Sequence, residues 1–224
     1  MMPPLYGLVL AGGRSRRMGR DKAALAYRVN DRGETVPHAR YTGDLLARVC
    51  EQVFYSCRAD QVDEQGKATD PVLLELSIGA GLIPDSFDIG VPLNGILSAQ
   101  KAHPEAAFLV AACDLPFLSA YALAQLVRER NPLHAATVFD NPERGMIEPL
   151  CAIYEPGFEE LAEASMMIGL TCPTKILSAL AEGGQIEILR PASAEFLANA
   201  NRPEDYEQAL AILSSSAATG MARG

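Results

Sequence analysis

Short apolar runs alternate with segments of helical periodicity along the whole chain. The runs that are typical of β-strands cover residues 5–11, 53–57, 107–112, 135–139, 148–154 and 185–189. The spacing of apolar side chains predicts helices over residues 44–52, 92–102 and 119–130, two more between 158 and 181, and a last one from 201. Strands that alternate with helices in this way predict an α/β fold with a mostly parallel central sheet.

The expected strand at 107–112 lies inside the longest unbroken apolar run, the eight residues 106–113. A strand without polar alternation fits a sheet that helices cover on both faces, which makes three layers. The run is too short for a helix to cross a bilayer. Residues 28–42 and 58–70 are polar or rich in turn formers, and we expect loops there. We expect a single domain over residues 1–213 and a disordered tail over 214–224.

The chain has 224 residues and a formal net charge of −9, from 19 basic and 28 acidic side chains. An acidic chain lacks the positive surface that grips a nucleic-acid backbone, so we do not expect nucleic-acid binding. Its positive charge is nevertheless concentrated in one place, because five basic residues lie between 14 and 22 with one acid. These five are Arg14, Arg16, Arg17, Arg20 and Lys22. A short positive loop on a negative protein indicates a small anionic ligand.

The five cysteines and three histidines are scattered along the chain, without a C-x-x-C pair or the spacing of zinc ligands. This distribution indicates a reducing cytoplasm rather than a disulfide framework. The first apolar stretch has no basic segment before it and runs into Gly12 and Gly13, which argues against a signal peptide. We therefore expect a cytoplasmic protein that does not bind a membrane.

The main chemical signal is the segment L-A-G-G-R-S-R-R-M-G-R-D-K at residues 10–22, directly after the first expected strand. Gly12, Gly13 and Gly19 permit backbone angles and close approaches that a side chain would prevent. Backbone N–H groups in such a loop can surround a phosphate, and its cations can neutralise the charge. The segment lacks the Lys-Ser/Thr ending of a Walker A loop and is not G-x-G-x-x-G. A solvated surface loop is the alternative, and the density of glycines and cations favours phosphate binding.

A second signal is Asp114, which follows the buried strand at 107–112. Open α/β sheets bind ligands beyond the carboxyl ends of their strands. A carboxylate at that position is well placed to hold Mg²⁺ against a triphosphate. Taken alone, Asp114 could equally cap a turn, and it is the phosphate loop that favours metal binding.

The last helix begins with a pattern that needs no ligand to explain it. Asn201 can cap the helix, Pro203 suits the first turn because it has no N–H, and Glu204 can complete a capping box. A binding role for Asn201 therefore requires separate support.

The segment at 10–22 resembles the pattern L-A-G-G-x-S-x-R-M-G-x-D-K of the molybdenum cofactor guanylyltransferases. Four further segments of that family follow in family order: P-L-x-G at 92–95, C-D-x-P at 113–116, E-P-L-C-A-I-Y at 148–154 and N-x-N-x-P-E-D at 199–205. The resemblance covers residues 5–210, nearly the whole chain. It implies a three-layer, Rossmann-like nucleotidyltransferase fold and a Mg²⁺-dependent transfer of GMP from GTP to molybdopterin, with release of pyrophosphate.

The resemblance also implies a set of site residues. Arg17, Lys22 and Asp114 are expected to be catalytic, with Asp114 as the Mg²⁺ ligand. The expected nucleotide-binding residues are Leu10, Ala11, Gly12, Gly13, Lys22, Arg58, Asp85 and Asp114. Those expected on the acceptor side are Asn94, Asn199 and Asn201.

Two positions depart from the family pattern. Arg58 stands where the family has an asparagine that touches the nucleotide, and Val91 stands where it has a glycine. Three alternatives stay open: transfer of CMP from CTP to molybdopterin, transfer of a nucleotide to a sugar phosphate, and a non-catalytic homologue that binds nucleotide. The sequence L-A-G-G, where the cytidylyl branch has L-A-A-G, favours GTP. Transient contact with molybdenum cofactor biosynthesis proteins or molybdoenzymes is a further expectation.

Overall fold

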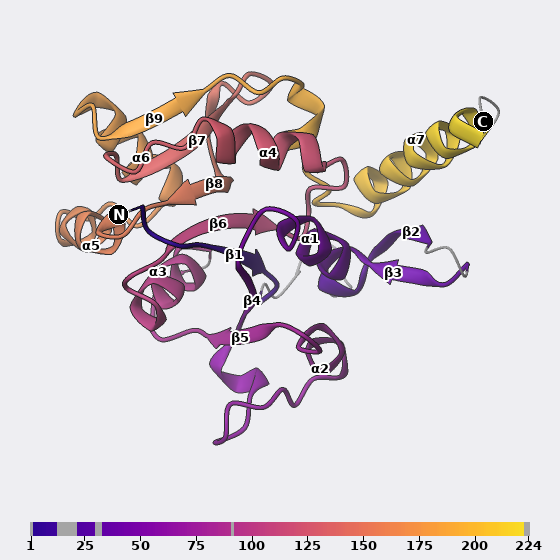
Figure 1. Cartoon of the computed structure of the whole chain (residues 1–224), viewed down its shortest axis with the longest axis horizontal. Coiled ribbons are helices and arrows are strands. Elements are labelled where there is room, and N and C mark those ends of the chain that lie inside the picture. Colours follow the sequence, from indigo (N-terminus) through magenta and orange to yellow (C-terminus); the bar gives the residue numbers. More distant parts are fainter. Residues whose placement is uncertain (1, 13–21, 30–32, 91, 222–224) are drawn as a thin grey trace.

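A seven-stranded sheet forms the centre of the protein (Figure 1), in a computed structural model that describes residues 2–12, 22–29, 33–90 and 92–221. The strand order is β5-β4-β1-β6-β8-β7-β9. Their bounds are β1 Leu5–Leu10, β4 Gln52–Cys57, β5 Gly81–Pro84, β6 Ala107–Ala112, β7 Ala136–Asn141, β8 Met146–Tyr154 and β9 Ile186–Leu189. Only β8 of these strands is antiparallel to its neighbours, β6 and β7. The mostly parallel sheet that the sequence predicted is thereby confirmed.

Helices cover both faces of this sheet, because its central strands are apolar on both sides. In β6 all six residues are buried, and alternate residues enter two separate cores. Leu109 packs with α1 (His38–Leu46), α2 (Pro71–Leu76) and α4 (Ala120–Arg128). Phe108 packs on the other face with α3 (Leu93–Ala102), α5 (Phe158–Met167) and α6 (Pro173–Glu182). The result is the expected three-layer α/β architecture.

The segment after β1 differs from the expectation. Residues 28–42, expected as a loop, contain most of an antiparallel hairpin of β2 (Ala26–Val29) and β3 (Thr35–Pro37), and the start of α1. The helix expected at 44–52 instead spans His38–Leu46. Gln52 and Val53, at the end of the expected range and just after it, belong to β4. Gly43, which reads as a loop signal, lies inside α1, where a side chain would overlap the Tyr55 hydroxyl. Close packing explains this glycine.

The carboxyl-terminal helix α7 (Pro203–Met221) projects on the same side of the molecule as the β2–β3 hairpin (Figure 1). The two are joined by a small apolar cluster that includes Leu25, Tyr27 and Ala209, and the Tyr206 hydroxyl donates to the carbonyl of Ala26 at 2.9 Å. The helix continues as far as Met221, through most of the segment 214–224 that the sequence predicts to be a disordered tail. None of the helices within the described residues combines the length and apolar content that a membrane crossing requires.

Candidate active site

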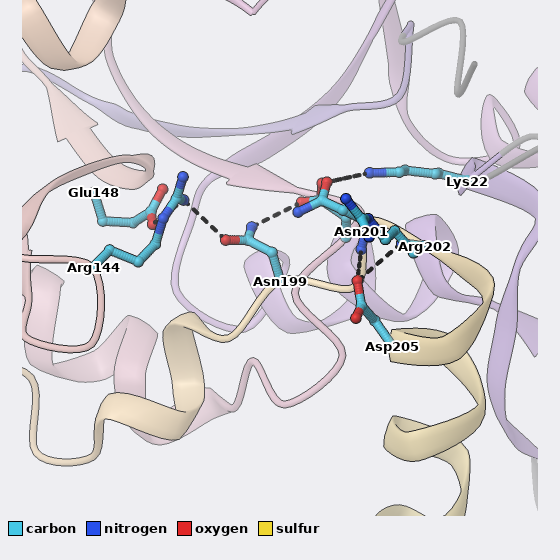
Figure 2. A network of polar contacts seen from close by, with 8 residues as sticks. Lys22, Arg144, Glu148, Asn199, Asn201, Arg202 and Asp205 are labelled. Carbon is cyan, nitrogen blue, oxygen red and sulfur yellow. Dashed lines mark hydrogen bonds and ion pairs between the residues drawn. The ribbon is translucent and has the colours of Figure 1, made fainter. Parts of the chain in front are cut away.

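Asp114 follows β6 and contacts both Lys22 and Asn199, two members of a polar network that Figure 2 shows. The Lys22 ammonium donates to Asp114 Oδ2 at 2.9 Å and to Asn201 Oδ1 at 2.8 Å. Lys22 stands 92 residues from one partner and 179 from the other, so only the fold brings the three together. The side chains of Lys22 and Asp114 are 18% and 16% exposed, which leaves the ion pair partly shielded but reachable by a ligand.

Asn201 takes part in this network because another residue caps α7. Asp205 Oδ2 accepts from the backbone N–H groups of Asn201 and Arg202, both at 2.9 Å. The expected cap by the Asn201 side chain, with Glu204 completing the box, was therefore wrong. The segment is held against the site by a bond of 2.9 Å from Ala200 N–H to the Asp114 carbonyl. The amide of Asn201 is left free to contact Lys22.

A second branch of the network contains Asn199, Arg144 and Glu148 (Figure 2), and Asn199 also contacts Asp114. The Asn199 amide nitrogen lies 3.4 Å from Asp114 Oδ1, and its oxygen accepts from Arg144 Nη1 at 3.1 Å. Arg144 Nη1 is also 3.7 Å from Glu148 Oε2. Neither Arg144 nor Glu148 was expected in the site. Arg144 lies in a turn between two strands, and its only sequence signal is the nearness of that turn to the E-P-L segment.

Glu148 is a buried anchor for this branch, with 1% of its side chain exposed. Its carboxylate accepts from Leu150 N–H at 3.1 Å and from the Asn141 amide at 3.2 Å. Burial raises the pKa of Glu148, and the nearby Asp114 carboxylate raises it further, while these two hydrogen bonds and Arg144 lower it. The buried acid and the half-exposed Arg144 together fix the position of Asn199.

The expected nucleotide side lies at the ends of β1 and β4. Leu10 ends β1, and Ala11 N–H donates to the Ser56 carbonyl at 3.3 Å. Gly12 follows, where a Cβ atom would stand 3.2 Å from the backbone nitrogen of Arg58. A larger residue would push the two strand ends apart, so glycine allows the backbone at residue 12 to lie close to that of Arg58. Gly13 and Arg17 lie outside the described residues.

Arg58 directly follows β4, and its side chain contacts the backbone at Gly12. Its Nη1 donates to the Gly12 carbonyl at 3.3 Å, and its Nε donates to Asp60 at 2.9 Å. Asp85 follows β5 beside it, with its N–H bonded to the Cys57 carbonyl at 2.8 Å. Burial raises the pKa of Asp85, an effect that the positive charge of Arg58 opposes. The fold thus brings Gly12, Arg58 and Asp85 to one place, on one side of Asp114 in the sheet.

Asn94 differs from the other expected site residues, because its polar atoms hold a neighbouring loop. Its oxygen accepts from Phe87 N–H at 3.2 Å and from the Ser98 hydroxyl at 3.1 Å, and its nitrogen donates to the Phe87 carbonyl at 2.6 Å. The side chain is buried, with 5% of the residue exposed. These contacts explain Asn94 structurally, without an acceptor.

The donors around Asp114 suit a hard divalent cation. Mg²⁺ is usually held by one or two carboxylates, water and substrate phosphates. Asp114 supplies one carboxylate, and the Lys22 ammonium already lies between Asp114 and Asn201 as a cation does. Within the described residues no group of three or more His, Cys, Asp or Glu side chains could hold a metal by itself. The residues present therefore fit a cation that a triphosphate helps to coordinate.

Residues 7–182 match the MobA-like NTP transferase domain family. The match covers most of the chain and includes Lys22, Asp114 and Arg144, whereas Asn199 and Asn201 lie beyond its end. The chain belongs to this family. The resemblance stated from the sequence motifs is thereby confirmed, and so is the nucleotidyltransferase class of enzyme.

Individual relatives agree with the family. The chain is 33% identical over 201 residues to a probable molybdenum cofactor guanylyltransferase of Mycobacterium marinum, covering 90% of each protein. It is 37% identical over 205 residues to a molybdenum cofactor biosynthesis bifunctional protein of Synechocystis, but spans only 53% of that protein's length. The fold is similar to the crystal structure of molybdopterin-guanine dinucleotide biosynthesis protein A of Archaeoglobus fulgidus, with a TM-score of 0.69, 22% identity, and coverage of 94% of this chain and 99% of the other.

Proposed function

We propose that the protein transfers GMP from GTP to molybdopterin, with Mg²⁺ as its cofactor. The proposal rests chiefly on the contact of Lys22, Asp114 and Asn201 at the carboxyl end of β6, beside the glycine turn that follows β1. Family membership supports the reaction class, and the names of the relatives support guanine and molybdopterin.

The reaction needs charge compensation more than a strong base. A phosphate monoester has a second pKa near 6, so the terminal phosphate of molybdopterin is mostly ionised near neutral pH. Its oxygen attacks the α-phosphorus of GTP, a P–O bond forms, and the bond from the α-phosphorus to the bridging oxygen breaks. The electron pair leaves with pyrophosphate. One anion must approach another, and the charge that builds on the leaving group must be stabilised.

The site residues divide this work between them. Lys22 exchanges Asp114 for a phosphate oxygen of GTP, and Arg17 is a second phosphate ligand. Asp114 would hold Mg²⁺, with the amide oxygen of Asn201 as a further candidate ligand, and the ion would supply positive charge that offsets the phosphate charge. Gly12, Arg58 and Asp85 bound the nucleotide side, while Asn199 faces the acceptor. Positioning the two substrates in line supplies much of the remaining rate.

The choice between GTP and CTP decides which nucleotide is joined to molybdopterin. Isothermal titration calorimetry with GTP, CTP, ATP and UTP in the presence of Mg²⁺ tests it, and we expect tightest binding of GTP. Turnover of GTP with molybdopterin, followed as pyrophosphate release and formation of the dinucleotide, tests the reaction. A preference for CTP would replace guanylyl by cytidylyl transfer. Tight GTP binding without turnover would favour a non-catalytic homologue.

The compartment is part of the same proposal. Within the part of the chain that the structure describes, no disulfide bond joins any of the five cysteines. This agrees with a reducing compartment. We propose that the enzyme acts in the cytoplasm and passes its product to molybdoenzymes or to other proteins of molybdenum cofactor biosynthesis.

A further inference from the structure

Arg144 lies on the opposite side of Asp114 from the nucleotide-side residues. In the sheet, β1 and β4 flank β6 on one side, whereas β8 and then β7 lie on the other. Gly12 and Arg58 follow β1 and β4, and Arg144 lies in the turn that joins β7 to β8. A nucleotide bound over Gly12 leaves the Arg144 side of Asp114 for the second substrate.

The guanidinium of Arg144 is held in place on one nitrogen. Its Nη1 contacts both Asn199 and Glu148, and Glu148 is buried and bonded on both oxygens. Within the described residues, neither Nε nor Nη2 of Arg144 has a hydrogen-bond partner, and half of the side chain is exposed. The buried acid fixes the group, and none of the residues that the structure describes accepts a hydrogen bond from its Nε–Nη2 edge.

An arginine edge with two parallel N–H donors matches two oxygens of one phosphate. We propose that Arg144 binds the phosphate of the acceptor substrate and presents it to the reacting phosphorus beside Asp114. The inference rests on the proposed function, because that function supplies an acceptor with a phosphate. Glu148 has a positioning role in it: the acid holds the guanidinium before the acceptor arrives, which reduces the entropy lost on binding.

A purely structural role for Arg144 is the rival explanation. In that case Arg144 would act only on Asn199, and through it on Asp114. Its loss would then weaken binding of the cation and the nucleotide. An acceptor anchor instead changes the acceptor KM and leaves the binding of metal and nucleotide intact, so the two explanations are separable.

The experiment compares Arg144→Met and Arg144→Lys with the wild type, and uses Arg202→Met as the matched control. Arg202 is an exposed arginine near the site, and among the described residues the contact with Asp205 is made by its backbone N–H and not by its side chain. The acceptor KM is measured with molybdopterin at saturating GTP and Mg²⁺. Binding of Mn²⁺ with GTP is measured separately by electron paramagnetic resonance. A third measurement follows the ³¹P shift of phenyl phosphate, a stable monoester, with Mg²⁺ and a GTP analogue that cannot react.

We expect Arg144→Met to raise the acceptor KM about 10- to 100-fold, as loss of hydrogen bonds to a charged group does. Arg144→Lys keeps the positive charge but loses the pair of parallel N–H donors. Its acceptor KM should therefore lie between those of the wild type and Arg144→Met. Binding of Mn²⁺ and GTP should stay within about twofold of the wild type, within the scatter of a neutral substitution. Arg202→Met should keep the wild-type KM.

Two results would overturn the anchor: an unchanged acceptor KM in Arg144→Met, or an equal rise in Arg202→Met, which would indicate a diffuse positive field. Weakened Mn²⁺–GTP binding without a KM effect would assign Arg144 the positioning role alone. If the wild type binds GTP but does not use molybdopterin, the proposed reaction is wrong. The ³¹P shift of phenyl phosphate then tests separately whether Arg144 binds a phosphate. A shift lost only in the Arg144 variants supports it, and a shift unaffected by Arg144 or absent in the wild type overturns it.

Discussion

His38 should make the stability of the protein depend on pH between about 4 and 6.5. The imidazole is 1% exposed, and its Nε2 lies 2.9 Å from the carbonyl oxygen of Leu115, the residue after Asp114. A carbonyl only accepts, so Nε2 carries the proton and donates. Burial lowers the pKa of His38 from 6.5 to about 4; the positive charge of Arg28 lowers it too, whereas the bond to Leu115 and the charge of Asp114 raise it.

The sign follows from which state takes up the proton. As the pH falls through 6.5 the unfolded chain protonates His38, while the folded protein does so only near 4. Protonation therefore favours unfolding in this window, and the folded state loses stability as the pH falls. One pKa unit corresponds to about 1.4 kcal/mol, so between pH 7.5 and 5 the loss from this one group is about 2 kcal/mol.

The test is urea unfolding of the wild type and His38→Gln at several pH values from 5 to 8. Glutamine can still donate to the Leu115 carbonyl but does not titrate. Asp85 and Glu148 have raised pKa values and titrate with the opposite sign, so the measured quantity is the difference between the two proteins. His134→Gln, a half-buried histidine beside Glu187, serves as the control. If the wild-type and His38→Gln stabilities run parallel over this range, the reasoning is refuted.

Four further substitutions test the site and its frame, with Arg14→Ala as a control. Asp114→Asn should abolish Mn²⁺ binding by paramagnetic resonance and slow turnover by orders of magnitude, with little change in melting temperature; near-normal turnover would make Asp114 only a turn residue. Lys22→Ala and Arg17→Ala should each lose about 2–4 kcal/mol of transition-state stabilisation, measured as kcat/KM, while Arg14→Ala stays near the wild type; full activity of Lys22→Ala would contradict the phosphate role. Gly95→Ala should lower stability by about 1–3 kcal/mol in urea unfolding, because its Cβ would come within 2.5 Å of a serine hydroxyl on β4; unchanged stability would show that α3 can shift without cost.

The sequence alone determined the elements whose signals are local. The strand at 107–112 was predicted with the bounds that β6 has, because its apolar run is continuous. The helix expected over 119–130 starts at a residue that can cap it, and Ser119 accepts from Ala122 N–H at 3.3 Å. Two helices were expected between 158 and 181, and the break between α5 and α6 contains Gly169, which has a positive φ of 87°. Capping, turn chemistry and apolar periodicity act within a few residues, so a sequence reveals them.

The tertiary structure decided the elements whose pattern depends on a partner. The short strands β2, β3 and β5 have at most four residues each, too few to show a period. The apolar run of β8 did not reveal its direction, since an antiparallel strand buried on both faces has the same composition as a parallel one. Gly43 lies inside α1 because the helix packs closely against Tyr55 of β4, a contact that no local pattern carries.

The candidate site divides in the same way. The motifs pointed to Gly12, Lys22 and Asp114 because loop glycines, cations and a strand-end carboxylate have recognisable local contexts. The partners of Asp114 were decided by the fold, which places Asn201 against Lys22 across 179 residues and gives the helix cap to Asp205. A capping residue and a ligand-binding residue look alike in a sequence, because both are short polar side chains beside a turn. What separates them is the distance to a group far along the chain, and only the packed structure sets that distance.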